Sequence, residues 1–148
     1  MSESNKKLNI NNIPIIGTAV FVRNNGKILL GKRKSTHGDG KWCLPGGLLE
    51  FGESIEDCAI RETKEEFNVD IKNLKFLGIG NDVTKDKHYV TIFIFADYLS
   101  GDIDISIFDE FYEWVWVKLD NFPNNKFYIL ENFLIKNFAL IEKLLKSN

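Results

Sequence analysis

Short runs of alternating or continuous apolar residues mark several β-strands along the chain. Strands are predicted over residues 13–23, 27–33, 74–80, 88–99 and 113–117. Between the first two strands, Asn25-Gly26 is a hairpin turn signal. In residues 88–99 both alternating sets of side chains are largely apolar, so we expect this strand to be covered on both faces of its sheet.

The apolar spacing changes to that of a helix in residues 54–67 and again in residues 127–146. Ser54 is suited to N-cap the first helix, and Asp57 completes a capping-box pattern. Asn68 tolerates the left-handed conformation that ends many helices. Strands combined with helices on both sides of a sheet predict an α/β layered sandwich.

Glycine and polar residues separate these elements. Residues 34–42 are polar and contain glycine, so they are predicted to form a loop. A tight turn is predicted at residues 44–47, where Gly46 and Gly47 can adopt backbone angles that other residues avoid. These glycines would also allow another group to approach the main chain closely.

The length of 148 residues suits one domain, which we place at residues 13–148 after a flexible polar lead at residues 1–12. The formal net charge of −2 gives no basic surplus, so no stable nucleic-acid partner is expected. The chain has no apolar run of signal-peptide or membrane-span length. A cytoplasmic protein with no membrane partner is therefore expected.

The cysteines and histidines offer little chemistry by spacing alone. Cys43 and Cys58 are not part of a CxxC motif and are expected to be reduced, with Cys58 buried on a helix face. His37 and His88 have no metal-ligand spacing. We interpret both as surface or loop residues, unless His37 contacts a substrate from its glycine-containing loop.

Carboxylates extend the apolar stripe of the helix predicted at residues 54–67. Glu62 and Glu66 continue the face of the core residues, and Glu65 lies beside them. Like charges at this spacing destabilise a helix, and partial burial raises the free-energy cost. A divalent cation such as Mg²⁺, which prefers oxygen ligands, would offset these terms. The alternative is a solvated acidic face that pairs with Arg61 and Lys64.

The segment GGLLEFGESIEDCAIRETKEEFNV (residues 46–69) resembles the signature of the Nudix hydrolases, with a Nudix box at residues 47–69. Thr63 and Asn68 depart from the signature, which usually has an aliphatic residue and a glycine there. Residues 28–34, 41–54, 88–92 and 113–117 extend the resemblance to the MutT-homologue nucleotide triphosphate diphosphatases. The resemblance implies the Nudix fold, an α/β/α sandwich with a mixed sheet and a loop–helix–loop catalytic motif.

The resemblance also implies roles for individual residues. The metal ligands would be Glu62, Glu65, Glu66 and the carbonyl oxygen of Gly46, with Mg²⁺ as the cofactor and Mn²⁺ as a possible substitute. Glu53 would position the site and Arg61 would orient the acidic residues. Substrate would be bound by Arg33, Gly46, Gly47 and Thr91, although a strand arginine or threonine is often only solvated or structural. The base would be Glu110, which we prefer over Asp109, and an ordinary acidic loop is the alternative.

The expected reaction is Mg²⁺-dependent hydrolysis of a nucleoside triphosphate to a monophosphate and pyrophosphate by metal-activated water. Other substrates remain open: a sugar nucleotide, a dinucleoside polyphosphate or a capped RNA. A Nudix module that binds nucleotides without turnover is a further alternative. We expect selectivity to depend on residues 34–42, 81–88 and 121–135, and the resemblance makes a homodimer plausible.

Overall fold

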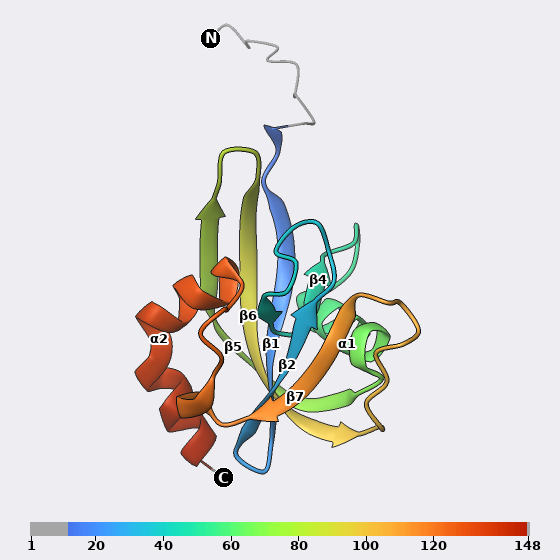
Figure 1. The fold of residues 1–148 in the computed structure, drawn as a ribbon, viewed down its shortest axis with the longest axis vertical. Helices are drawn as coiled ribbons and strands as arrows, with labels where there is room; N and C mark the ends of the chain where they lie inside the picture. The colour runs from blue at the N-terminus through green and yellow to red at the C-terminus, as the bar shows by residue number, and fades with distance from the viewer. Residues whose placement is uncertain (1–11, 148) are drawn as a thin grey trace, which may run out of the picture.

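A mixed seven-stranded sheet lies between helices α1 and α2 in the computed structural model, which describes residues 12–147 (Figure 1). The elements are β1 (Ile15–Asn24), β2 (Lys27–Arg33), β3 (Trp42–Cys43), β4 (Gly46–Leu48), α1 (Ile55–Phe67), β5 (Asp70–Val83), β6 (His88–Ser100), β7 (Phe111–Val117), η2 (Leu119–Asn121) and α2 (Tyr128–Lys146). The predicted α/β/α sandwich is confirmed. The predicted lead lies outside the described residues, apart from Asn12.

Strand β1 is the centre of the sheet and changes its partner along its length. The strand order is β3-β2-β1-β6-β5, while β4 pairs with β1 and β7 pairs with β2. The first half of β1 pairs with β4 at Gly17–Ala19, and β2 pairs with it only at Arg23 and Asn24. On its other side β1 pairs in parallel with β6 throughout, from Ile15↔Tyr89 to Arg23↔Asp97. Strands β2 and β4 therefore diverge on one side of β1.

The two faces of the sheet bury separate apolar clusters. On one face Phe21 and Phe93 pack against Phe133 of α2, and the rings of Phe93 and Phe133 stack with centroids 3.8 Å apart. On the other face Val20 and Ile94 belong to the cluster that contains Phe67 of α1. Strand β6 supplies alternate residues to both clusters, so the prediction that it is covered on both faces is confirmed.

Helix α1 begins and ends at the predicted residues. The Ser54 hydroxyl accepts a hydrogen bond from the Asp57 N–H at 3.0 Å, and Asn68 ends the helix in the left-handed region at φ 59°. The Asn68 N–H donates to the carbonyl of Lys64 at 2.9 Å. Thr63 is fully buried, and its hydroxyl donates to the carbonyl of Ala59 at 2.8 Å. Both departures from the Nudix signature are thus accommodated locally.

The prediction of a tight turn at residues 44–47 is wrong. Gly46 and Gly47 lie in strand β4, and neither has a positive φ. The glycine at 46 is needed for space, because a Cβ there would overlap the backbone oxygen of Thr18 on β1. The predicted loop at residues 34–42 likewise ends in strand β3, which begins at Trp42. These two glycines are therefore required by the close approach of other groups and not by a turn.

Helix α2 confirms the helix predicted at the end of the chain, with an interruption. Asn137 has φ −128° and ψ 15°, which are not helical, and its side chain donates to the carbonyl of Phe133 at 3.0 Å. This bond satisfies a carbonyl where the helix bends. No helix between residues 12 and 147 combines the length and apolar character needed to cross a membrane.

Phe133 is expected to carry much of the stability on the α2 face. Replacing Phe133 with Ala removes a ring that stacks on Phe93 and leaves a cavity, so the free energy of unfolding should fall by about 3–5 kcal/mol. Phe138→Ala is the matched control on the same helix, because Phe138 is exposed, and its effect should stay below about 1 kcal/mol. Urea denaturation of both variants measures the difference. Equal losses would contradict this account of the core.

Candidate active site

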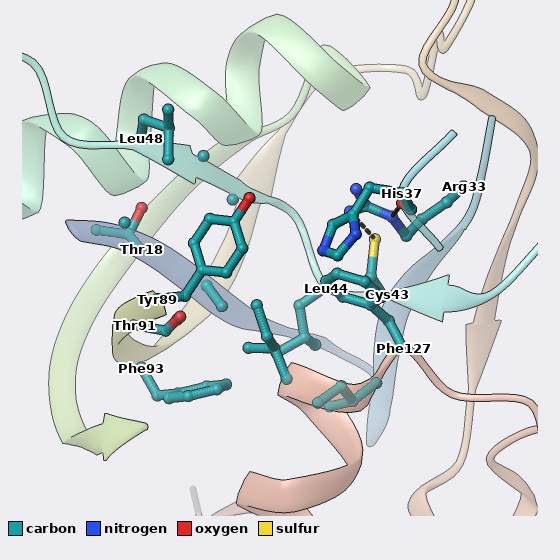
Figure 2. Close-up of a pocket in the computed structure, with 16 residues that line it drawn as sticks. Thr18, Arg33, His37, Cys43, Leu44, Leu48, Tyr89, Thr91, Phe93 and Phe127 are labelled. Atoms are coloured by element: carbon teal, nitrogen blue, oxygen red, sulfur yellow. Dashed lines mark hydrogen bonds between the residues drawn. The ribbon is translucent and has the colours of Figure 1, made fainter. Parts of the chain in front are cut away.

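Two cavities lie side by side where β2 and β4 diverge from β1. One is mainly apolar, has a volume of about 270 Å³ and is lined by residues of β1, β2, β4, β6 and the start of α2 (Figure 2). The other has a volume of about 580 Å³ and is lined by Glu50, Glu62, Glu66 and Glu110 together with basic residues. Arg33, Gly46 and Leu48 line both cavities. A single ligand could therefore extend from the apolar cavity into the acidic one.

Glu66 is the most deeply buried carboxylate of the acidic cavity, with 9% of its surface exposed. Its Oε1 accepts a hydrogen bond from the Gly46 N–H at 2.7 Å, which joins the end of α1 to β4. Burial raises the pKa of Glu66 well above its ordinary value; the Gly46 N–H opposes this shift, and the neighbouring Glu110 carboxyl adds to it. Glu66 is therefore a buried carboxylate with a second carboxylate, that of Glu110, beside it.

Glu62 lies one turn earlier on α1, against the backbone of β4. A Cβ at residue 47 would overlap the Glu62 carboxylate, so any other residue there would displace this side chain from its present position. Burial raises the pKa of Glu62, Arg61 lowers it, and the charges of Glu65 and Glu110 raise it further. The prediction that the glycines allow a close approach is confirmed, and the approaching group is a carboxylate.

The guanidinium group of Arg61 donates hydrogen bonds to three carboxylates. It binds Glu53 with two hydrogen bonds, Nε to Oε2 at 2.7 Å and Nη2 to Oε1 at 2.9 Å. Its Nη1 donates to Glu62 at 2.7 Å and to Glu65 at 3.2 Å. The pairs with Glu53 and Glu62 raise the pKa of Arg61 above its ordinary value. Arg61 therefore stands where the sequence analysis expected an orienting group.

Among residues 12–147, no three histidine, cysteine, aspartate or glutamate side chains already converge as a metal site. The contacts of Arg61 and of Gly46 explain this, because they draw Glu62 and Glu66 to different partners. The donor chemistry nevertheless fits a hard divalent cation, since the cavity presents several carboxylates, two of them with pKa values raised by burial. The burial of Glu62 and Glu66 therefore favours a cation site over the alternative of a solvated acidic helix face.

Of the two acidic residues before β7, only Glu110 lines the acidic cavity. Asp109 points to solvent, with 74% of its side chain exposed, and pairs with Lys34 Nζ at 2.8 Å. The Glu110 carbonyl also accepts a hydrogen bond from the Lys34 N–H at 2.9 Å, which fixes this loop beside β2. The placement agrees with the preference for Glu110 over Asp109.

Arg33 stands at the boundary between the two cavities. Its guanidinium carbon lies 4.1 Å from the centre of the Phe127 ring, and its Nε donates to the carbonyl of His37 at 3.0 Å. Within residues 12–147 it has no carboxylate partner closer than the ion-pair distance of 4.0 Å. A cation held in place without a protein anion is suited to bind a phosphate.

Several aromatic residues that the sequence pattern did not mark line the apolar cavity. His37 is half-buried rather than a surface residue: its ring stacks on Tyr89 with centroids 5.9 Å apart, and its Nε2 lies 3.3 Å from the Tyr128 hydroxyl. Figure 2 shows the Tyr89 ring standing in the cavity between Thr91 and His37. Phe127 closes the cavity from the start of α2. Aromatic residues in widely separated segments gave no local signal that they would meet.

The other residues considered in the sequence analysis are a threonine, a second histidine and the two cysteines. Thr91 is buried on the cavity wall, as its predicted place near a substrate requires. His88 lies on the β5–β6 hairpin, 2.6 Å from the Asn81 side chain. Cys43 and Cys58 are buried, and burial raises the pKa of Cys43 to about 12 and also raises that of Cys58, so both thiols remain protonated at neutral pH. The prediction of reduced, unreactive cysteines agrees with this environment.

Residues 14–135 match the family model described as the NUDIX domain. An ADP-ribose pyrophosphatase from Methanocaldococcus jannaschii is 31% identical over 116 residues, which cover 77% of this chain and 68% of the relative. A nucleoside triphosphatase NudI from Escherichia fergusonii is 34% identical over 110 residues, 66% of this chain and 77% of the relative.

Solved structures and longer relatives agree with this family. A MutT NUDIX hydrolase from Burkholderia pseudomallei superposes with a TM-score of 0.78 and 26% identity, over 83% of this chain and 97% of that one. The NAD-capped RNA hydrolase NudC from Pseudomonas aeruginosa is 33% identical, but the chain spans only 36% of its length. Together with the carboxylate helix and its glycine strand, these matches establish that the chain belongs to the Nudix hydrolase family.

Proposed function

We propose that the protein hydrolyses a nucleoside triphosphate to a nucleoside monophosphate and pyrophosphate with the help of Mg²⁺. The observation that carries this proposal is the pair of adjoining cavities, one apolar and one acidic, that share Arg33 and Gly46. A nucleotide has the same division, with an apolar, aromatic base at one end and phosphates that bind cations at the other. The base would enter beside Thr91, and the phosphates would pass Arg33 toward the carboxylates of α1.

Glu62, Glu65, Glu66 and the Gly46 carbonyl are the proposed metal ligands. In the β1–β4 ladder, Val20 N–H bonds to the Pro45 carbonyl and Leu49 N–H to the Ile16 carbonyl, so Gly46 falls between hydrogen-bonded positions. Its N–H points away from β1, to Glu66, and its carbonyl follows the same direction. A bound Mg²⁺ would neutralise phosphate charge and make a coordinated water more acidic.

The carboxylates of this chain supply the proton chemistry. Glu110 lines the acidic cavity, and its carboxyl group lies next to that of Glu66. We assign Glu110 as the base that accepts a proton from the attacking water. Arg61 and Glu53 do not touch substrate in this proposal; they are positioning residues that hold Glu62 and Glu65 on one side of the helix.

Relatives with a different named activity support a second substrate class for this protein. An ADP-ribose pyrophosphatase and a nucleoside triphosphatase are similarly identical to this chain, at 31% and 34%. The nucleoside triphosphatase match covers 77% of that relative and the ADP-ribose pyrophosphatase match 68% of the other, and we keep the triphosphate as the first assignment. The predicted homodimer stays a prediction.

Substrate class can be decided with a panel of nucleotides. Purified protein with Mg²⁺ should convert nucleoside triphosphates to monophosphates and pyrophosphate, and ADP-ribose, a sugar nucleotide, a dinucleoside polyphosphate and NAD-capped RNA should react at lower kcat/KM. Anion-exchange chromatography of the products distinguishes pyrophosphate from single phosphate release. Preferential cleavage of ADP-ribose would replace the triphosphate assignment by the second class.

The ligand assignment predicts a selective effect of Glu66→Gln. The amide keeps an acceptor for the Gly46 N–H but loses the charge, so Mg²⁺-dependent turnover should fall by at least about a hundredfold while the melting temperature is maintained or rises. Glu56→Gln, on the exposed start of the same helix, is the matched control and should retain activity. Mn²⁺ binding followed by electron paramagnetic resonance should weaken only in the Glu66 variant. Undiminished Mn²⁺ binding there would reject Glu66 as a ligand.

The Arg61–Glu53 pair predicts a pH dependence of stability. Hydrogen bonds from Arg61 lower the pKa of Glu53 to about 2, below its unfolded value of about 4.3. Because the folded pKa is the lower one, the stabilisation is fully present above the unfolded pKa and is lost as the pH falls through about 2. In Arg61→Ala the Glu53 pKa should return toward its ordinary value, whereas Lys64→Ala should leave it low. Carboxyl carbon NMR titration measures this, and an ordinary Glu53 pKa in the unaltered protein would disprove the effect of Arg61.

A further inference from the structure

Asp82 is a buried carboxylate that the proposed reaction does not use. Only 6% of its surface is exposed, and it lies on β5, far from the acidic helix face in sequence. Its Oδ1 accepts a hydrogen bond from the side chain of Asn132 on α2 at 2.7 Å. Its Oδ2 is covered and has no hydrogen-bond partner in the part of the chain that the structure describes. Leaving a buried carboxylate oxygen unpaired is unfavourable, so it calls for a ligand or a functional explanation.

The sheet places Asp82 beside the apolar cavity. Its cross-strand partner on β6 is Tyr89, and the next pair on the same face is Gly80↔Thr91. Both Tyr89 and Thr91 line the cavity. Asn132, which holds Asp82, follows the cavity residue Leu130 on α2, the helix that lies next to β5 (Figure 1). The carboxylate thus stands behind the wall against which a base would bind.

The glycine at residue 80 directs the unpaired oxygen toward that wall. A Cβ on Gly80 would lie 3.2 Å from Asp82 Oδ2 and 2.9 Å from the ring of Phe93, another cavity residue. The Asp82 carboxylate therefore leans back along β5, over Gly80 and toward Thr91, rather than toward the exposed hairpin. Tyr89, the half-buried cross-strand partner of Asp82, lines the cavity on the same face of the sheet.

The Tyr128 hydroxyl, at the start of α2, is influenced by the same carboxylate. Burial, followed by the charges of Tyr89 and Asp82, raises the pKa of the Tyr128 hydroxyl. That hydroxyl in turn lies 3.3 Å from His37 Nε2. Asp82 therefore lies on the strand pair that forms one wall of the apolar cavity, and its Oδ2 lacks a hydrogen-bond donor among the described residues.

We propose that Asp82 is the specificity-determining residue for the base of the nucleotide, an inference that rests on the proposed function. The exocyclic amino group of the base donates an N–H to Asp82 Oδ2. The Tyr89 ring turns aside as the base enters beside Thr91, and Asn132 keeps the other carboxylate oxygen in place. A carboxylate accepts but does not donate, so bases with an amino group at that position are favoured over keto bases. A site with such a buried acceptor rejects a base that leaves it unpaired.

Matched base pairs test this inference directly. dCTP and dUTP exchange an amino for a keto group at one ring position, and GTP and ITP differ by one amino group. In the unaltered protein kcat/KM should favour the amino member of at least one pair by about ten- to a hundredfold, the value of one hydrogen bond to a charged group. Asp82→Asn replaces the free acceptor by a donor if Asn132 keeps its bond, so the preference should disappear or reverse.

Control variants separate recognition from folding. Asp86→Asn makes the same chemical change on the exposed β5–β6 hairpin and should leave the base preference intact. Asp82→Asn removes a buried charge, so its melting temperature should equal or exceed that of the unaltered protein. If Asp82→Asn does not fold, Asn132→Ala tests the same contact from an exposed position on α2 and should also reduce the preference.

Binding of nucleoside monophosphates, measured by calorimetry without metal, distinguishes this inference from the reaction itself. The unaltered protein should bind CMP more tightly than UMP, or GMP more tightly than IMP, and Asp82→Asn should abolish this difference. That result would support the role of Asp82 even if no triphosphate were hydrolysed. Triphosphate hydrolysis with the same base preference in Asp82→Asn as in the unaltered protein would overturn the role of Asp82 and leave the proposed function standing. Equal use of both members of both pairs by the unaltered protein would overturn it as well.

Discussion

The contact of the α1 carboxylates with a side-chain-free stretch of backbone is the constraint on which the site depends. Glu62 lies against Gly47 so closely that any Cβ would overlap it, and Glu66 accepts the Gly46 N–H. Arg61 then neutralises the charges that this arrangement crowds together, and its two hydrogen bonds to Glu53 fix the direction of the guanidinium. Helix, strand and loop are thus held by groups that would repel one another without Arg61.

The sheet also separates the acidic cavity from the apolar cavity. Strand β1 passes from β4 to β2 on one side while it stays paired with β6 on the other, and the divergence leaves room for both cavities. The acidic cavity is built from α1, the end of β2, β4 and the start of β7, and the apolar cavity mainly from β1, β4, β6 and the start of α2. Changes in β5, β6 or α2 can therefore alter what enters without disturbing Glu62 or Glu66.

Much of the architecture was predictable, because periodicity and capping are local properties. Ser54 and Asn68 bound α1 where their side-chain and backbone preferences indicated, and the doubly apolar pattern of residues 88–99 indicated a strand covered on both faces. The acidic residues were identified because their spacing on a helix coincides with the Nudix signature of residues 46–69. His37 was considered only as a possible substrate contact from its loop, and Tyr89 and Asp82 were not identified, since their surroundings arise from pairing between segments that are distant in sequence. Gly46 and Gly47 were assigned to a turn because a close approach and a turn demand the same residue.

The parallel ladder between β1 and β6 has a kinetic consequence. Ile15 pairs with Tyr89 and Gly17 with Thr91, so these contacts close a long loop that contains the whole of β2, α1 and β5. Loop closure opposes such pairing, and topologies dominated by distant contacts fold slowly. The hairpin of β1 and β2 and the capped helix α1 rest on neighbouring residues and can form earlier. Helix α1 would then exist in a nascent chain before the wall of the apolar cavity, which is completed only when residues emerging later dock against the first strand.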